Sequence, residues 1–238
     1  MNALIGHTGF VGSNISRQAS FDECYNSKNI EQIRERSFDV IVCAGVSSLK
    51  WKANRHPNED FLNIEQLIEN MTKASFKKLI LISTIAVYDN PADNAYGRNR
   101  LYLETFLSNK YDDVLIVRLP SLFGKGIKKN PIYDLLHKDY RFLPNPDSQF
   151  QYYCLDNLWK DITIAVENNI KYLNICSEPV VFSEVLNLFK TNIMTLNEKT
   201  IYERMTSKHS AHWQRDDGYL YGKEETLKQM ESFINEYE

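Results

Sequence analysis

Three glycines near the start of the chain have the spacing of a phosphate-binding turn. Gly6, Gly9 and Gly12 follow the mostly apolar residues 1–5, and residues 11–18 can form a helix. Glycines let the backbone adopt positive φ and approach a pyrophosphate, while the N–H groups and dipole of a helix start attract the anion. The spacing Gly-x-x-Gly-x-x-Gly differs from the Gly-x-Gly-x-x-Gly of the standard dinucleotide fingerprint, which leaves a purely structural turn as the alternative. The context favours a dinucleotide.

A second group of chemically capable residues stands farther along the chain. Thr84, preceded by Ser83, ends an apolar run, and Tyr96 and Arg100 lie four residues apart in a segment that can be helical. A phenol can act as an acid or a base, and a nearby cation favours its ionised form. Because positions i and i+4 share a helix face, Arg100 can project beside Tyr96. The alternative is a solvated helix stripe in which Arg100 pairs with Glu104.

Apolar runs alternate with helical patterns along the chain, which predicts an α/β protein with a Rossmann-like, doubly wound parallel sheet. Residues 1–120 are expected to form its core. Residues 121–238 are expected to form a small C-terminal substrate lobe, from which residues 155–176 return to the core. Ligands of such sheets bind at the carboxyl ends of the strands, where both groups of residues lie. The predicted strands are residues 1–5, 23–26, 38–44, 78–83, 114–118 and 172–176, and the predicted helices are residues 11–18, 29–36, 58–75, 96–109, 155–167, 183–189 and 223–237.

Composition excludes several classes of protein. The 238 residues are 43% hydrophobic, enough for a core without metals or disulfides, and the four dispersed cysteines are expected to be reduced thiols. A net charge of −3 with scattered Lys and Arg gives no sign of nucleic-acid binding. His209 and His212 lack a third ligand at suitable spacing, so no metal site is expected. A strand that starts at residue 2 and the lack of an apolar run of about 18 residues predict a cytoplasmic protein with no signal peptide and no membrane span.

The segment that begins at Ile82, ISTIAVYDNPADNAYGRNRLYLE, resembles the short-chain dehydrogenase/reductase superfamily. It is most similar to the extended, NAD-dependent epimerase/dehydratase branch, which acts on nucleotide sugars. The resemblance implies that Thr84 orients the substrate oxygen and Tyr96 moves its proton. Arg100 stands where the family has lysine, and would bias Tyr96 and hold the cofactor ribose. Thr84 and Tyr96 are twelve residues apart, so a substrate-side loop of the extended branch is expected to be missing.

The resemblance also assigns residues to ligands. CAG at residues 43–45 resembles the family's segment against the adenine and its ribose, and RLPSLFG at residues 118–124 resembles the crossover near the nicotinamide. Asn63 would bond the sheet backbone, or alternatively lie on the helix surface. The implied cofactor-binding residues are Gly6, Thr8, Gly9, Phe10, Val11, Gly12, Asn26, Ser27, Lys28, Cys43, Ala44, Gly45, Ser83, Pro120 and Ser121. The residues expected to line the substrate cleft, where paired cations would suit a diphosphate, are Ser47, Lys50, Trp51, Lys128, Lys129 and Asn130. A solvated charged face is the alternative for the lysines.

The residues after the second predicted strand bear on the choice of cofactor. An acidic residue that would bond a ribose 2′-hydroxyl is missing there, and the chain reads Asn26-Ser27-Lys28. A lysine with a serine tolerates a 2′-phosphate better than a carboxylate would, so NADP is weakly preferred over NAD. A solvated loop cation is the alternative for Lys28.

Together these features predict an NAD(P)-dependent epimerase, dehydratase or reductase that acts on a nucleotide-linked sugar or related polyol. The alternative is a catalytically degenerate NAD(P)-binding protein that serves as a sensor or scaffold, which the replacement of lysine by Arg100 favours. The helices at residues 58–75 and 96–109 match those that pair between subunits in the superfamily, so a homodimer is expected.

Overall fold

The computed structural model describes residues 1–191 and 197–237, and the chain divides into two compact units. The first unit comprises Met1–Leu119 and Leu158–Leu173, and the second comprises Pro120–Asn157 and Asn174–Glu238. The chain therefore leaves the first unit after its fifth strand, returns to it for one helix and most of one further strand, and leaves it again.

The first unit is built on a six-stranded sheet with the order β2-β1-β3-β4-β5-β9. The pairs β1–β2, β1–β3, β3–β4 and β4–β5 are parallel. The chain runs from β1 outward to β2 and then crosses back to β3 on the other side of β1. The strands are β1 (Asn2–Ile5), β2 (Glu23–Tyr25), β3 (Ser37–Cys43), β4 (Ser75–Thr84), β5 (Val114–Leu119) and β9 (Tyr172–Asn174). The predicted Rossmann-like parallel sheet is confirmed, and its strand order reverses between β1 and β3, where such folds bind ligands.

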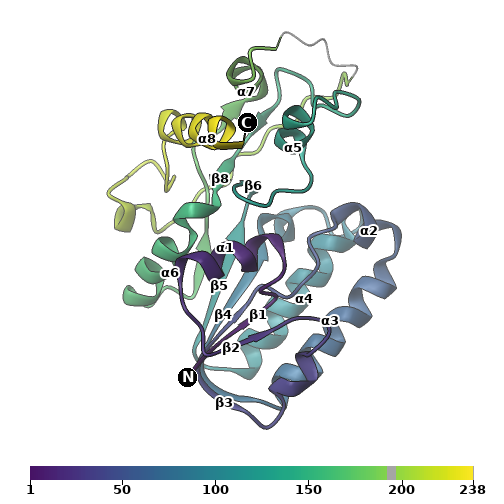
Figure 1. Ribbon diagram of the computed structural model, residues 1–238, viewed down its shortest axis with the longest axis vertical. Coiled ribbons are helices and arrows are strands. Elements are labelled where there is room, and N and C mark those ends of the chain that lie inside the picture. The colour runs from purple at the N-terminus through teal and green to yellow at the C-terminus, as the bar shows by residue number, and fades with distance from the viewer. Residues whose placement is uncertain (192–196, 238) are drawn as a thin grey trace. The chain divides into compact units, whose positions relative to one another are not determined.

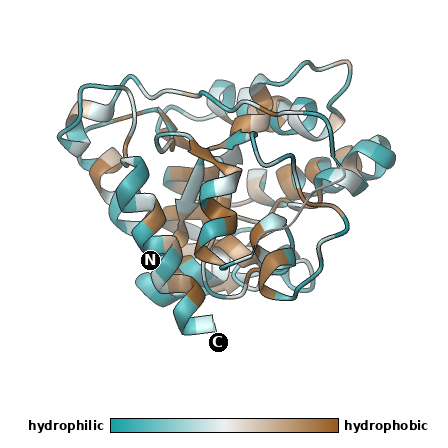
Figure 2. Cartoon of the chain, turned by 90° about the horizontal axis from the view of Figure 1, so that it is seen from above, coloured by the Kyte–Doolittle hydropathy of each residue, from teal (hydrophilic) through white to brown (hydrophobic). Residues whose placement is uncertain are grey.

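Helices cover both faces of this sheet (Figure 1), with α3 and α4 on one face and α1 and α6 on the other. Along each helix, apolar residues alternate with polar ones (Figure 2), as expected of helices with one buried face. Apolar side chains of α3 and α4, such as Ile64 and Leu103, share one core with strand residues such as Ile41 and Leu79. The helices of this unit are α1 (Phe10–Gln18), α2 (Lys50–Arg55), α3 (Pro57–Thr72), α4 (Ala95–Lys110) and α6 (Leu158–Glu167).

One local prediction for the first unit is wrong, and one helix was not predicted. Residues 29–36 form only a short 3-10 helix, η1 (Ile30–Ile33), because Arg34 is extended and Glu35 adopts a φ of +63°. Helix α2 was not expected, because its sequence KWKANR has no apolar periodicity. A second 3-10 helix, η2 (Ile85–Tyr88), links β4 to the segment before α4.

The second unit combines two small sheets with short helices. β6 (Ser121–Phe123) pairs with β8 (Tyr152–Cys154), and β7 (Gln149–Phe150) pairs with β10 (Val180–Val181). Gln151, fully buried between β7 and β8, donates to the carbonyls of Ser177 and Met205 and accepts from the Met205 N–H, which ties a late segment of the chain to the unit. The helices are α5 (Pro131–Leu136), α7 (Phe182–Leu188) and α8 (Lys223–Tyr237), with the 3-10 helices η3 (Leu155–Asn157) and η4 (Ser210–Trp213).

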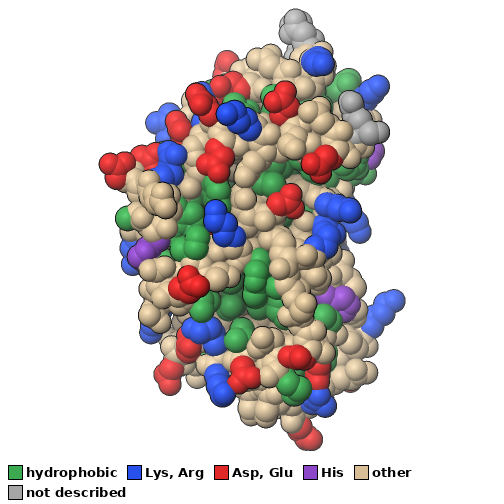
Figure 3. Space-filling view, turned by 60° about the vertical axis from the view of Figure 1, so that its left-hand side comes forward, with side chains coloured by type: hydrophobic (Ala, Val, Ile, Leu, Met, Phe, Trp, Pro, Cys, Tyr) green, Lys and Arg blue, Asp and Glu red, His purple; other side chains and the backbone are tan. Residues whose placement is uncertain are grey.

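Three of the four cysteines are buried, and the surface carries charges of both signs. Cys43, Cys154 and Cys176 are buried free thiols, whereas Cys24 on the edge strand β2 is exposed. Acidic and basic side chains are intermixed on the face in Figure 3. In the described part of the chain, no helix is both long enough and apolar enough to span a bilayer.

Candidate functional site

The glycine turn between β1 and α1 is closed so tightly that two of its glycines are required. Gly6 has a φ of +86°, and a Cβ atom on it would lie 2.3 Å from the carbonyl oxygen of Ala44. A Cβ atom on Gly12 would lie 2.1 Å from the Gly6 oxygen. Gly9 differs, because its Cβ atom would have only that same oxygen nearby, at 3.3 Å, and the residue is exposed. Gly6 and Gly12 therefore close the turn, while Gly9 leaves its outer side open.

The start of α1 beside this turn is suited to an anion. Gly9 is the N-cap residue, so no side chain caps the helix, and the first turn holds no acidic residue. The first N–H groups of a helix have no partner within it, and together with the helix dipole they attract negative charge. The close approach of Gly6 to Ala44 also brings the CAG segment to the same place. A backbone cradle that a Cβ would fill, next to an uncapped helix start, fits the pyrophosphate of a dinucleotide.

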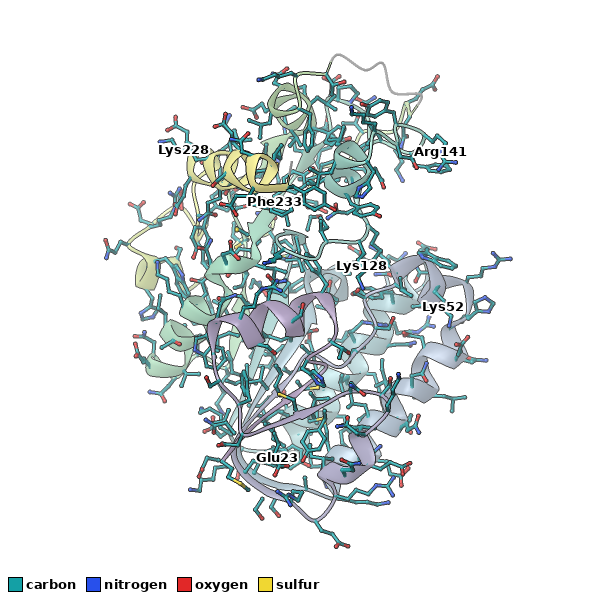
Figure 4. The ribbon with its side chains drawn as sticks, viewed as in Figure 1. Glu23, Lys52, Lys128, Arg141, Lys228 and Phe233 are labelled. Atoms are coloured by element: carbon teal, nitrogen blue, oxygen red, sulfur yellow. The ribbon has the colours of Figure 1, made fainter. Side chains whose placement is uncertain are left out.

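The turn after β2 presents no carboxylate. Asn26 accepts a hydrogen bond from the Lys28 N–H at 2.8 Å, and its own N–H donates to Asn29 at 2.7 Å, so the turn is held by its own side chains. Glu23 lies at the opposite end of β2 (Figure 4) and binds Arg36 and the Tyr25 hydroxyl. The exposed Lys28 is therefore the charged group among residues 26–28.

The end of β4 and the start of α4 are held close together by hydrogen bonds and packing through η2. The Thr84 hydroxyl accepts a hydrogen bond from the Ala86 N–H at 3.2 Å, which begins η2. The Asn94 amide donates to the Ala86 oxygen at 3.0 Å, and a Cβ atom on Gly97 would lie 2.0 Å from that same oxygen. Thr84 and Tyr96 thus stand at the two ends of a short connection whose ends are packed against each other.

Arg100 is buried, with 3% of its surface exposed, and its guanidinium is held by protein groups. Its Nη1 and Nη2 atoms donate to the two carboxylate oxygens of Asp60 at 2.6 and 2.9 Å. Nη2 also donates to the Ser47 carbonyl at 2.6 Å, and Nη1 to the Tyr96 carbonyl at 3.1 Å. The guanidinium lies 3.8 Å from the centroid of the Tyr96 ring. Arg100 stands beside Tyr96, as expected, but Asp60 compensates its charge.

The solvated stripe considered as the alternative for this helix is wrong. Glu104 is buried and forms an ion pair with Arg118 of β5, with Nη2 and Oε2 2.6 Å apart. It also accepts a hydrogen bond from the Ser83 hydroxyl, so Ser83 faces this pair. Arg118 in turn donates to the Tyr88 hydroxyl. Arg100 and Glu104 both take partners from other elements because the face of α4 that carries them packs inward.

The residues assigned to substrate lie in both units. In the first unit, Lys50 of α2 forms an exposed ion pair with Asp89 at 2.9 Å, and Trp51 is 62% exposed. In the second unit, Asn130 is the N-cap of α5 with a φ of +126°, while burial lowers the pKa of the Lys129 ammonium. Lys129 is nevertheless exposed at the surface, as is Lys128. Pro120 and Ser121, which were assigned to the cofactor, lie at the start of β6.

Three structural residues escaped the sequence reasoning. Asp60 is the partner of Arg100, in place of the Glu104 of the alternative interpretation. Its spacing of four residues from the buried Ile64 was the available signal for an inward-facing acid. Asn54, whose side-chain oxygen accepts a hydrogen bond from the Tyr96 N–H at 2.9 Å, has no such signal in the sequence. Asn63 is exposed, so it takes the second of the two positions considered for it, on the helix surface, and does not bond the sheet backbone. Asn70 is the buried asparagine of α3 and accepts from Arg34 at 2.8 Å.

Comparison with known proteins shows what the fold resembles. No family model and no curated protein sequence matches the chain. A UDP-N-acetylglucosamine 4-epimerase from Methanobrevibacter ruminantium has a TM-score of 0.75 at 12% identity, covering 98% of this chain and 96% of that one. A dTDP-4-dehydrorhamnose reductase from Yersinia enterocolitica gives 0.75 at 15% identity, covering 100% and 99%. The corresponding reductase from Bacillus anthracis, in complex with NADP, gives 0.75 at 14% identity, covering 99% and 98%. The chain has the fold of these nucleotide-sugar enzymes over its whole length.

Proposed function

We propose that this protein is an NAD(P)-dependent epimerase, dehydratase or reductase that acts on a nucleotide-linked sugar. The observation that carries the proposal is the glycine cradle beside the uncapped start of α1, at the point where the strand order of the sheet reverses. The described relatives support it, since the Methanobrevibacter epimerase was solved with UDP-N-acetylmuramic acid and the Bacillus reductase with NADP.

The proposed chemistry uses two hydroxyl groups of the first unit. The nicotinamide, when bound, supplies or accepts a hydride. Thr84 orients the substrate oxygen, and the Tyr96 phenol donates or removes its proton. Arg100 stacks against the Tyr96 ring and fixes it. The N–H groups at its Nη1 and Nη2 atoms donate hydrogen bonds to Asp60 and to two backbone carbonyls. We therefore assign Arg100 to holding Tyr96 in place of the ribose contact that the resemblance implied.

The cofactor is proposed to be NADP in preference to NAD. Lys28 carries the charge of the turn after β2, and the Glu23 carboxylate is bound to Arg36 at the other end of that strand. A cation within a few ångströms of a 2′-phosphate favours binding by about 1 kcal/mol at a solvated site. Fluorescence titration should therefore give tighter binding of NADPH than of NADH.

A second function is favoured by the ion pair of Arg100. Because Asp60 compensates the guanidinium charge, Arg100 does not act as the free cation that the family's lysine places beside the tyrosine. A protein that binds NAD(P) without turnover, as a sensor or scaffold, is therefore the competing reading of the same fold.

Replacing Tyr96 by phenylalanine separates the two functions. In an assay of hydride transfer, with deuterium wash-in for net-neutral epimerisation, across a panel of nucleotide sugars, we expect Tyr96→Phe to lose turnover by about 10²–10⁴-fold. NADPH binding should stay unchanged, because only the hydroxyl oxygen is removed. Tyr140→Phe, which alters an exposed tyrosine of the second unit, is the matched control. Cofactor binding without any turnover that Tyr96→Phe removes would establish the binding protein instead.

A further inference from the structure

The start of α4, which carries Tyr96, is capped by a residue from another helix. The helix has no acidic residue in its first turn, and its own N-cap residue, Asn94, makes no side-chain bond to it. The Asn94 amide instead donates to Ala86 and Asp89. The Tyr96 N–H, one of the first N–H groups that no helical carbonyl reaches, donates to the side-chain oxygen of Asn54 on α2 at 2.9 Å.

Three contacts thereby restrain Tyr96 from different directions. Asn54 accepts from its N–H, the Arg100 guanidinium donates to its carbonyl, and the same guanidinium covers one face of its ring. Arg100 is itself fixed by Asp60 and by the Ser47 carbonyl, both of which flank α2 in the sequence. Residues in and next to α2 therefore bind both the backbone of Tyr96 and the Arg100 guanidinium that covers its ring.

We infer that α2 is the element that positions Tyr96, and that Asn54 is a positioning residue of the site. The inference rests on the proposed function of Tyr96. The connection from Thr84 to Tyr96 is short, so α4 starts close to the end of β4, and the side chain of Asn54 supplies an acceptor that this connection does not.

The other side-chain link between α2 and this region is weaker. Lys50 of α2 and Asp89 form an ion pair at 2.9 Å, but their side chains are 53% and 48% exposed. Exposed ion pairs contribute little, because water and salt screen them and both side chains lose rotamer freedom. The bond from Tyr96 to Asn54 is also exposed, but it carries no charge for salt to screen, and it reaches the backbone of Tyr96 itself. We therefore assign the positioning to Asn54.

Three variants test the inference. Asn54→Ala removes the acceptor, Asn54→Asp keeps an acceptor oxygen, and Asn58→Ala is the matched control in the exposed first turn of α3. Because a small misplacement of a catalytic group can cost up to about 10²-fold in rate, we expect Asn54→Ala to lower kcat about ten- to hundredfold with KM and NADPH binding unchanged. Asn54→Asp should restore kcat, and Asn58→Ala should match the wild type. Equal losses in Asn54→Ala and Asn58→Ala, a loss confined to KM, or no rescue by aspartate would overturn the inference.

Amide hydrogen exchange provides a readout that does not need turnover. In Asn54→Ala, the amides of residues 95–98 should exchange faster than in the wild type, and Asn54→Asp should reverse the change. If the wild type turns over no nucleotide sugar, the proposed function fails, and the exchange data still decide whether Asn54 holds the start of α4. Unchanged exchange in Asn54→Ala would reject the positioning role by itself.

Discussion

At the scale of single residues, the three glycines of the first turn do different work. A Cβ atom on Gly12 would overlap the Gly6 carbonyl, whereas a Cβ atom on Gly9 would meet only that oxygen, at 3.3 Å. Gly9→Val should therefore leave the fold intact and place its methyl groups where the turn would hold a pyrophosphate. We expect Gly9→Val to abolish NADPH binding in a fluorescence titration without lowering the unfolding midpoint substantially. Gly12→Val should lower that midpoint, because it forces the turn open. Wild-type affinity in a folded Gly9→Val protein would refute the phosphate site.

Arg100 illustrates why charge alone does not describe a buried cation. Its planar fork bonds both oxygens of Asp60 together with the Ser47 and Tyr96 carbonyls, a set that a single ammonium cannot reproduce. Arg100→Lys should therefore lower the free energy of unfolding by about 1–3 kcal/mol, measured by urea denaturation, and lower turnover. Arg98→Lys, at an exposed position on the same helix, is the control. Unchanged stability with raised activity would instead show that position 100 supplies only charge.

At the scale of elements, α5 depends on one strained residue. Asn130 has a φ of +126°, and its side-chain oxygen accepts from the N–H groups of Ile132 and Tyr133 while its amide donates to Leu122 at 2.7 Å. Both variants lose the side-chain cap, at a cost of about 1 kcal/mol in Asn130→Ala and only a few tenths of a kcal/mol in Asn130→Gly. Glycine relieves the backbone strain, which is worth on the order of 1–3 kcal/mol, and alanine does not. Amide exchange in residues 131–136 should therefore be faster in the alanine variant than in the glycine variant. Faster exchange in the glycine variant than in the alanine variant would show that the backbone of Asn130 is not strained.

The elements that were predicted correctly are those with strong local patterns. β4 contains a continuous apolar run, and α8 has apolar residues at helical spacing. Their secondary structure is therefore determined by their own residues, which a sequence pattern can detect. Helix α2 is short and polar, and its side-chain contacts to the Tyr96 N–H and to Asp89 reach segments about forty residues away. Pattern analysis within a window cannot include such contacts, and α2 was missed for that reason.

In the candidate site, too, the features set by neighbouring residues were predictable and those set by distant contacts were not. The glycine turn was predictable because strand, turn and helix start are adjacent in sequence. The i+4 rule gave Arg100 the neighbouring Glu104 as a partner, but that rule describes exposed helices. Both residues are buried here, and each is paired across an interface, with Asp60 and with Arg118. The packing of α4 between α3 and the sheet decides the pairing, and that packing is a property of the fold.

At the scale of the whole molecule, a buried thiol makes the free energy of unfolding fall as the pH becomes alkaline. Burial raises the pKa of Cys43 from its ordinary value of 9.0 to about 11. The folded state thus keeps the neutral thiol while the unfolded chain ionises first, so the stabilisation is complete below pH 9 and is lost as the pH rises through 11. Between these values, the free energy of unfolding should fall more steeply for the wild type than for Cys43→Ala. Parallel curves would show that the Cys43 thiol titrates alike in both states.

The outer surface of α3 and α4 carries apolar residues that the single chain leaves in water. Leu62 is 66% exposed, Leu101 and Tyr102 are each 37% exposed, and the rings of Phe61 and Tyr102 lie 4.9 Å apart. Tyr102 also donates to Glu65 at 2.6 Å, which fixes its ring on this surface. Apolar residues contiguous across two helices suit a self-complementary interface, in which the same surface of two copies packs together about a two-fold axis.

We therefore expect a homodimer through this surface. Light scattering should give a mass near twice the 27.8 kDa of the chain at micromolar concentration. Leu62→Glu should shift the mass to that of one chain, because dimerisation through this surface would bury an unpaired carboxylate. Phe142→Glu is the matched control, since Phe142 of the second unit is 80% exposed and lies outside this surface, so its substitution should leave the mass unchanged. A wild-type mass of one chain would exclude the dimer, and loss of the dimer in Phe142→Glu but not in Leu62→Glu would place the interface elsewhere.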